Sequence, residues 1–125
     1  MRVFVKEQGV PEEIELDVDD ERAFHFLAFK RDKPIATARV VMRAGNAKIG
    51  RMAVLKTSRR QGVGKRLLKQ AVGFAKTKGA KKIFLHAQVA VIGFYEKAGF
   101  LCIGRMFSEA GIPHRKMILR ADRQR

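Results

Sequence analysis

The chain has 125 residues, 46% of them hydrophobic, and a formal net charge of +15, which suits one domain, residues 1–125, with one core. Its apolar runs are far shorter than the roughly 20 residues of a membrane-spanning helix, and no signal-peptide run precedes Lys6. Cys102 is the only cysteine, so an internal disulfide is excluded, a reducing compartment is favoured and a cytoplasmic protein is expected.

Alternating apolar and β-branched residues predict three strands in the first half of the chain. The first covers Ala23 to Phe29 and the second Ile35 to Met42, with a turn from Arg31 to Pro34 between them. Ala44 to Ala47 contains a Gly-Asn pair and predicts a hairpin connection to a third strand, Lys48 to Leu55.

Helical periodicity follows the third strand. Apolar residues recur at helical spacing from Val63 to Ala75, basic residues occupy the other face, and Gly79 is typical of a helix C-terminus. A strand from Lys82 to Ala87 completes a βαβ unit and should run parallel to Lys48–Leu55.

The last third of the chain predicts a short helix and two closing strands. The helix covers Val91 to Ala98, and the strands cover Leu101 to Met106 and Arg115 to Leu119. The predicted class is therefore α/β (α+β), with a mixed, mostly antiparallel sheet.

A glycine turn, Arg59-Arg60-Gln61-Gly62-Val63-Gly64, links the third strand to the long helix. The first N–H groups of a helix lack internal partners and carry the positive end of its dipole, and glycine lets a ligand approach the backbone. The turn therefore favours a diphosphate, to which Arg59, Arg60 and Lys65 would add charge-assisted bonds. It is not a Walker A loop, and Leu67 stands where Gly-x-Gly-x-x-Gly needs its third glycine.

Several stretches carry a family resemblance. Arg59-x-x-Gly62-x-Gly64 resembles motif A of the GNAT superfamily of N-acetyltransferases, and GFYEKAGF, Gly93 to Phe100, is similar to the family's second marker. VFVKEQGVPEEIELD near the start, HAQ at His86 to Gln88 and EAGIPHRKM at Glu109 to Met117 resemble the small bacterial ElaA/YjcF-type branch. The resemblance covers essentially the whole chain. It implies a GNAT-like fold, with helices on both faces of the sheet and a central pair of parallel strands that splay apart.

The resemblance also places the start of this chain inside the family's first helix. Members of this branch usually carry a first strand and much of a first helix before the VFVKEQ segment. The expected domain lacks both, which would leave a sheet edge uncovered and makes a homodimer plausible. Glu7 and Gln8 resemble part of the family's wall on the acceptor side.

The resemblance implies acetyl-CoA as co-substrate and no metal. The N–H groups of Gln61 to Lys65 would bind the coenzyme A diphosphate, and the strand that contains Met52 would pair with the pantetheine arm and polarise the thioester carbonyl. An ordinary buried strand is the alternative interpretation of that segment. The implied cofactor-binding residues are Met52, Ala53, Val54, Arg59, Arg60, Gln61, Gly62, Val63, Gly64, Lys65, Gln88 and Tyr95.

Three residues are candidates for catalysis: Tyr95, Glu109 and His114. Tyr95, the only tyrosine, stands where the family places the acid that protonates the leaving thiolate, although a tyrosine packed in the core is the alternative. The resemblance does not identify the general base. Some relatives carry a Glu at the position of Gly50, so that candidate is absent here. The remaining candidates are Glu109, His114, His86 and a water molecule that relays the proton. A turn histidine bonded to a nearby carbonyl is the alternative for His114.

The implied function is transfer of an acetyl group from acetyl-CoA to an amine, by direct attack in a ternary complex. The acceptor would be a small molecule or a peptide, and the sequence does not identify it. From Arg22 onward 25 Lys and Arg face four acids, whereas seven of the twelve acids lie between Glu12 and Glu21. This basic body favours non-specific polyanion binding at low salt, although a solvated basic surface is the preferred interpretation because no stacking aromatics accompany it. Two alternative functions stay open: the chain is a basic nucleic-acid-binding protein, or it is a GNAT-like protein without catalytic activity.

Overall fold

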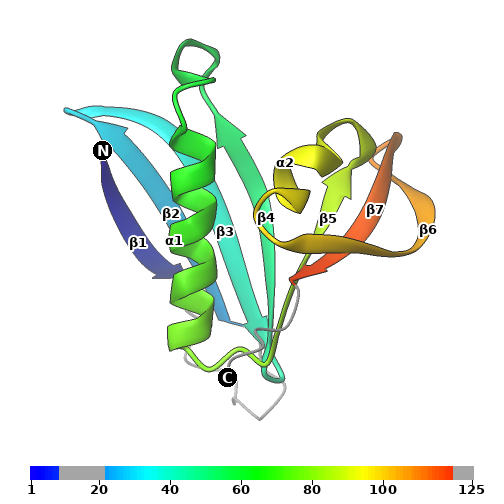
Figure 1. Ribbon diagram of the computed structural model, residues 1–125. Coiled ribbons are helices and arrows are strands. Elements are labelled where there is room, and N and C mark those ends of the chain that lie inside the picture. Colours follow the sequence, from blue (N-terminus) through cyan, green and yellow to red (C-terminus); the bar gives the residue numbers. More distant parts are fainter. Residues whose placement is uncertain (9–21, 120–125) are drawn as a thin grey trace.

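The computed structural model describes residues 1–8 and 22–119 (Figure 1). Within these residues, seven strands form one mixed sheet in the order β1-β2-β3-β4-β5-β7-β6. The strands are β1 (Arg2–Gln8), β2 (Arg22–Lys30), β3 (Lys33–Arg43), β4 (Asn46–Val54), β5 (Lys82–Gln88), β6 (Phe100–Glu109) and β7 (Ile112–Leu119). The helices of the described ranges are α1 (Val63–Thr77) and α2 (Ile92–Glu96), with 3-10 turns η1 (Lys56–Ser58) and η2 (Val89–Val91).

The predicted sheet is confirmed in class and in strand direction. Of the strand pairs in the described ranges, β4 and β5 are parallel, as the βαβ unit requires, and the other pairs are antiparallel. Element boundaries differ from prediction by up to three residues, and β7 begins at Ile112 in place of Arg115 because Ile112 and Pro113 already pair with β6. The predicted helix from Val91 to Ala98 begins with the 3-10 turn η2 and ends as α2 at Glu96. β6 runs three residues past Met106, because Phe107 to Glu109 resume pairing with β7 after a bulge around Gly104.

The N-terminal segment contradicts the prediction that the chain starts inside a helix. Residues 2–8 form β1, which pairs antiparallel with β2 from Arg2↔Phe29 to Gln8↔Ala23. Without this pairing, β2 would present a row of unpaired N–H and C=O groups. The Phe4 ring packs edge to face on Phe29, with centroids 5.6 Å apart, and the Arg2 guanidinium lies 5.4 Å from each ring. In the part of the chain that the structure describes, β1 and not β2 is therefore the edge strand on this side.

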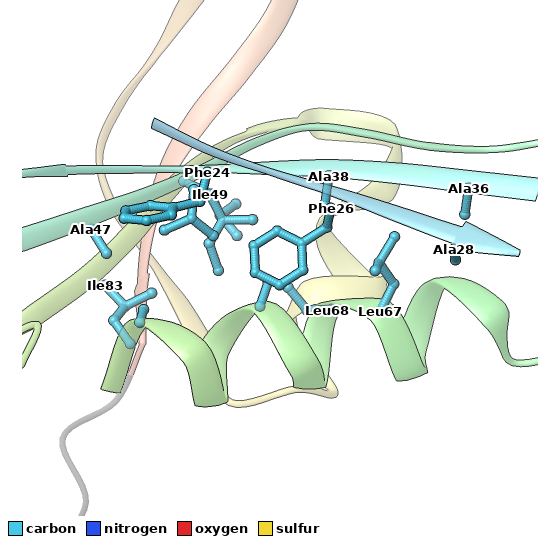
Figure 2. Packing of buried hydrophobic residues seen from close by; sticks show 14 of the residues in the cluster. Phe24, Phe26, Ala28, Ala36, Ala38, Ala47, Ile49, Leu67, Leu68 and Ile83 are labelled. Atoms are coloured by element: carbon cyan, nitrogen blue, oxygen red, sulfur yellow. The ribbon is translucent and has the colours of Figure 1, made fainter. Parts of the chain in front are cut away.

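The core lies between α1 and the sheet. α1 contacts β2, β3 and β4, and Figure 1 shows it in front of β2 and β3 with β4 beside it. Figure 2 shows Leu67 and Leu68 of α1 directed at Phe26 and at the neighbouring alanines of the strands. Phe74 adds an edge-to-face contact to Phe26, with centroids 5.2 Å apart. Small strand residues opposite large helix residues let the helix lie close to the sheet.

Replacing Leu67 by alanine should lower the free energy of unfolding by about 2–5 kcal/mol, because its fully buried side chain would leave a cavity in this core. Urea unfolding followed by circular dichroism measures the change. Lys69→Ala, on the exposed side of the same helix, is the matched control and should stay within about 0.5 kcal/mol of the unaltered chain. An equal loss for both variants would contradict the assignment of Leu67 to the core.

Candidate functional site

The parallel strands β4 and β5 separate halfway along their length. In the described part of the chain they pair from Asn46↔Lys82 to Ile49↔Leu85 and not beyond, although β4 continues to Val54 and β5 to Gln88. Figure 1 shows the two strands diverging as a V, with the N-terminus of α1 at its open end. The predicted splay is therefore present, and it leaves the second half of β4 unpaired on the side that faces β5.

A β-bulge lies where the strands separate. Arg39 pairs with Gly50 while Thr37 pairs with Ala53, so β4 holds one more residue than β3 between these pairs. Arg51 takes up the extra length in the left-handed region, at φ +49°. A bulge bends its strand and redirects the following backbone groups. The bulge thus accounts for the outward course of residues 52–54.

The V encloses a cleft of about 1400 Å³. Residues from β3, β4, the glycine turn, β5, α2 and the β6–β7 hairpin line it. Gln61 is absent from the lining, because its side-chain amide donates to the carbonyl of Thr57 at 3.2 Å. The predicted site residues that do line the cleft are Met52, Ala53, Val54, Arg59, Arg60, Gly62, Val63, Gly64, Lys65, Gln88, Tyr95, Glu109 and His114.

The glycine turn delivers the N-terminus of α1 to this cleft. Gly62 is the N-cap residue, at φ +76° in the left-handed region, where glycine carries no penalty. The first turn of α1 contains no acid, and no side chain of residues 1–8 or 22–119 caps it. The N–H groups at this end are therefore available to an anion from outside the helix.

Close packing supports the turn from beneath. A Cβ on Gly64 would lie 3.4 Å from the Phe94 ring and 3.5 Å from Val54, so glycine lets α1 begin against α2 and β4. A Cβ on Gly62 would meet no atom of the described residues within 4 Å. The Arg59 Nε donates to the Val54 carbonyl at 3.0 Å and ties the turn to the end of β4. Glycine is thus used for conformation at Gly62 and for packing at Gly64.

Tyr95 of α2 reaches across the cleft to β4. Its ring packs edge to face on Phe94 and Phe100, with centroids 5.0 and 6.1 Å away. Its hydroxyl lies 4.0 Å from the Met52 sulfur. Burial raises the pKa of Tyr95 above 10.0, so the phenol keeps its proton at neutral pH. The ring of Tyr95 is therefore packed against other aromatic rings, while the residue still lines the cleft.

His86, Glu109 and His114 come together at the side of the cleft formed by β5, β6 and β7. The Nδ1 of His86 lies 3.0 Å from Glu109 Oε1, and the Nε2 of His114 lies 3.9 Å from Oε2. The Nδ1 of His114 lies 2.8 Å from the Ile112 carbonyl, the contact expected of a turn histidine. Phe107 packs against both imidazoles. The cluster assembles three residues that the sequence treats as separate candidates.

Glu109 is the anionic member of this cluster. The hydrogen bond from His86 is the main cause that holds the pKa of Glu109 below 4.5. Burial opposes it, and the charges of His86, His114 and Lys48 lower the pKa further. A carboxylate with a lowered pKa is a weak base. Glu109 is therefore better suited to orient His86 than to accept a proton itself.

Other residues line the cleft that the sequence did not single out. Arg39 and Val41 of β3, Lys48 of β4 and Phe94 of α2 belong to this group. Arg39 stands between the buried residues Ala38 and Val40 on a central strand. The sequence signal for Arg39 was a charged residue within an otherwise apolar strand. The strand pattern alone does not say whether the face that carries Arg39 borders a cleft.

Some features lie elsewhere. Glu7 of β1 pairs with Arg22 at 2.7 Å and is not among the cleft residues. The acidic run from Glu12 to Glu21 lies outside the described residues. Across residues 1–8 and 22–119, no three His, Cys, Asp or Glu side chains are grouped to hold a metal ion. None of the helices in these ranges is long and apolar enough to cross a membrane.

Comparisons with known proteins agree on one family. The family model of the acetyltransferase (GNAT) domain matches residues 1–121. An uncharacterized N-acetyltransferase of Bacillus subtilis, YjcF, is 38% identical over 117 residues, which cover 93% of this chain and 84% of YjcF.

Solved structures extend this likeness to the fold. The crystal structure of Escherichia coli ElaA superposes with a TM-score of 0.71 at 26% identity, over 78% of this chain and 68% of ElaA. An aminoglycoside 6'-N-acetyltransferase complexed with coenzyme A shares the fold at 17% identity, with a TM-score of 0.68 over 80% of this chain and 76% of that protein. The predicted resemblance to the ElaA/YjcF-like branch is confirmed.

Proposed function

Because the chain belongs to the GNAT acetyltransferase family, we propose that it transfers an acetyl group from acetyl-CoA to the amine of a small molecule or peptide, by direct attack in a ternary complex. One observation carries the proposal. The open N-terminus of α1, the unpaired half of β4 and the Tyr95 hydroxyl all border a single cleft. Acyl transfer needs these three components together: an anion site, a strand edge and a proton donor.

The residues present fit coenzyme A. The N–H groups of Val63, Gly64 and Lys65 at the start of α1, together with the Arg60 and Lys65 side chains, would hold the diphosphate. The unpaired β4 backbone from Met52 to Val54 would bond the pantetheine amides as an added strand does. When bound, acetyl-CoA supplies an activated acetyl thioester. An aminoglycoside acetyltransferase of the same fold was solved with coenzyme A, which supports coenzyme A as the ligand proposed for this cleft.

Two proton transfers accompany the reaction. His86, held by Glu109, would accept the proton of the attacking amine, and Tyr95 would donate a proton to the leaving thiolate. The N–H of Met52, just past the bulge, would stabilise the developing oxyanion of the thioester carbonyl. Gln88 and His114, which also line the cleft, would contact the bound substrates. In this scheme, Glu109 positions the base.

A calorimetric titration with acetyl-CoA tests the cofactor site. Salt of about 0.15 M and about 0.5 M separates specific from purely electrostatic binding, because polyanion binding weakens steeply with salt. ADP and a short RNA are the controls. Saturable acetyl-CoA binding that survives the higher salt and exceeds ADP supports the proposal. RNA binding alone, confined to low salt, would favour the nucleic-acid alternative.

Replacing Glu109 by glutamine should lower kcat about ten- to hundredfold from pH 5 upward, where the carboxylate is ionised and orients His86. Glu109 has a lowered pKa, so its contribution is present above 4.5 and is lost as the pH falls through the lowered value. The gap between the two proteins should therefore close on the acid side. Acetylation rates across pH, with folding checked by circular dichroism, measure it.

Glu96→Gln is the control, since it removes an exposed carboxylate of α2 that does not line the cleft. It should leave kcat unchanged. A Glu109→Gln variant as active as Glu96→Gln would remove Glu109 from the mechanism.

A further inference from the structure

Besides the cations around the glycine turn, Arg39, Lys48 and Arg51 line the cleft, and the first two lie on paired parts of β3 and β4. Arg39 of β3 pairs with Gly50, and Lys48 of β4 pairs with Val41. Their chain neighbours Val40 and Ile49 are buried in the core with α1. Successive residues of a strand point to opposite faces, so Arg39 and Lys48 project from the face that α1 leaves uncovered.

Arg39 has an unmet hydrogen-bonding requirement. Its Nε is buried and has no hydrogen-bond partner among residues 1–8 and 22–119. Buried donors in folded proteins are almost always bonded, and an orphan is a place where a ligand group fits. The group that satisfies a guanidinium best is a carboxylate or phosphate, which can accept two parallel N–H bonds.

The charges of the cleft do not balance internally. Among the described residues that line it, Glu109 is the one carboxylate, and His86 already bonds it. Arg59, Arg60 and Lys65 surround the start of α1, where the diphosphate is proposed to bind. Within residues 1–8 and 22–119 neither Arg39 nor Lys48 forms an ion pair, although the charge of Lys48 acts on Glu109. The cleft therefore keeps positive potential on the β3–β4 side after the cofactor binds.

We propose that the amine acceptor is a small anionic amine, whose carboxylate or phosphate binds Arg39 and Lys48 while its amino group faces the thioester. This inference rests on the proposed function. Gly50, the partner of Arg39, lies two residues from Met52, at most roughly 7 Å along β4, because the bulge at Arg51 shortens the extended spacing. The anionic group of the acceptor should thus be a few bonds from its amine. The same cations would repel a polycationic amine.

Matched pairs of amines test the inference on the full chain. β-Alanine with β-alaninamide tests a carboxylate, O-phosphoethanolamine with ethanolamine tests a phosphate, and spermidine represents polycations. Thiol release from acetyl-CoA measures the rates. At least one anionic amine should exceed its neutral partner and spermidine in kcat/KM by about tenfold or more.

Arg39→Gln should lower that anionic-to-neutral ratio by about ten- to hundredfold, mainly through the KM of the amine, and leave the KM of acetyl-CoA unchanged. Comparing ratios cancels differences in amine basicity. Arg43→Gln is the control, because it removes one charge from the same strand outside the cleft. Lys48→Gln carries the same test if Arg39→Gln does not fold.

Preference for the neutral amines or spermidine, or a ratio that Arg39→Gln leaves intact, would overturn the inference. Calorimetry with the same pairs, with and without saturating coenzyme A, separates the two proposals. If acetyl-CoA binds and no amine binds or reacts, the acceptor inference fails and the cofactor site stands. If acetyl-CoA neither binds nor reacts, the proposed function fails. In that case, Arg39-dependent binding of an anionic amine still supports this anion site, and its absence refutes it.

Discussion

Replacing Gly62 by glutamate should weaken acetyl-CoA binding by about a hundredfold or more while the chain still folds. Gly62 is the N-cap of α1 and lines the cleft at φ +76°. A carboxylate there would occupy the space proposed for the diphosphate, repel it, and compete for the open N–H groups. Because a Cβ at this position meets no atom within 4 Å, the fold itself has room for the new side chain.

The substitution carries a conformational cost that needs its own control. A non-glycine residue in the left-handed region costs about 1–2 kcal/mol. Gly79, just past the other end of α1, has φ +89° and equally open surroundings but lies outside the cleft. Gly79→Glu should therefore lose similar stability and keep its affinity for acetyl-CoA. Unchanged affinity in Gly62→Glu would reject the phosphate-site assignment.

Replacing Tyr95 by phenylalanine should lower kcat by about 10²- to 10⁴-fold, with little change in the KM for acetyl-CoA. Phenylalanine keeps the ring contacts to Phe94 and Phe100 and removes only the hydroxyl that reaches Met52. The raised pKa of Tyr95 keeps the phenol protonated up to pH 10 and beyond. Its own deprotonation should therefore produce no alkaline loss of rate below that pH.

Steady-state rates of thiol release measure this effect, and thermal unfolding checks the packing. Met52→Leu is a useful companion, since it removes the sulfur next to the hydroxyl and keeps the bulk of the side chain. It should stay within a few-fold of the unaltered rate. A Tyr95→Phe variant of full activity would leave Tyr95 with the packing role alone.

Local pattern predicted most of the elements and one part of the site. Residue alternation indicated β2, β3, β4 and β5, and helical spacing indicated α1, because these periods reflect one face turned to the core. The glycine turn could be predicted because its whole signal lies in adjacent residues: glycines that allow a left-handed backbone, followed directly by a helical pattern. The parallel direction of β4 and β5 followed from the handedness and length of the connection between them.

Tertiary structure decided what depends on partners distant in sequence. The segment Arg2–Gln8 is a strand because β2 offers it a ladder of hydrogen bonds, which its own sequence does not reveal. The contact between His86 and Glu109 spans 23 residues of sequence. It arises because β7 pairs both with β5, which carries His86, and with β6, which carries Glu109. The bulge at Arg51, the separation of β4 from β5 and the orphaned Arg39 Nε likewise arise from pairing between strands.

The sequence by itself thus determined the elements after Arg22, the parallel direction of β4 and β5 and the glycine turn, since each is encoded in the period and backbone preference of nearby residues. The cleft, its cluster of titratable groups and its positive β3–β4 side were decided only by the folded chain. They result from which strands pair and where that pairing stops, and the free energy of such contacts comes from residues far apart in the sequence.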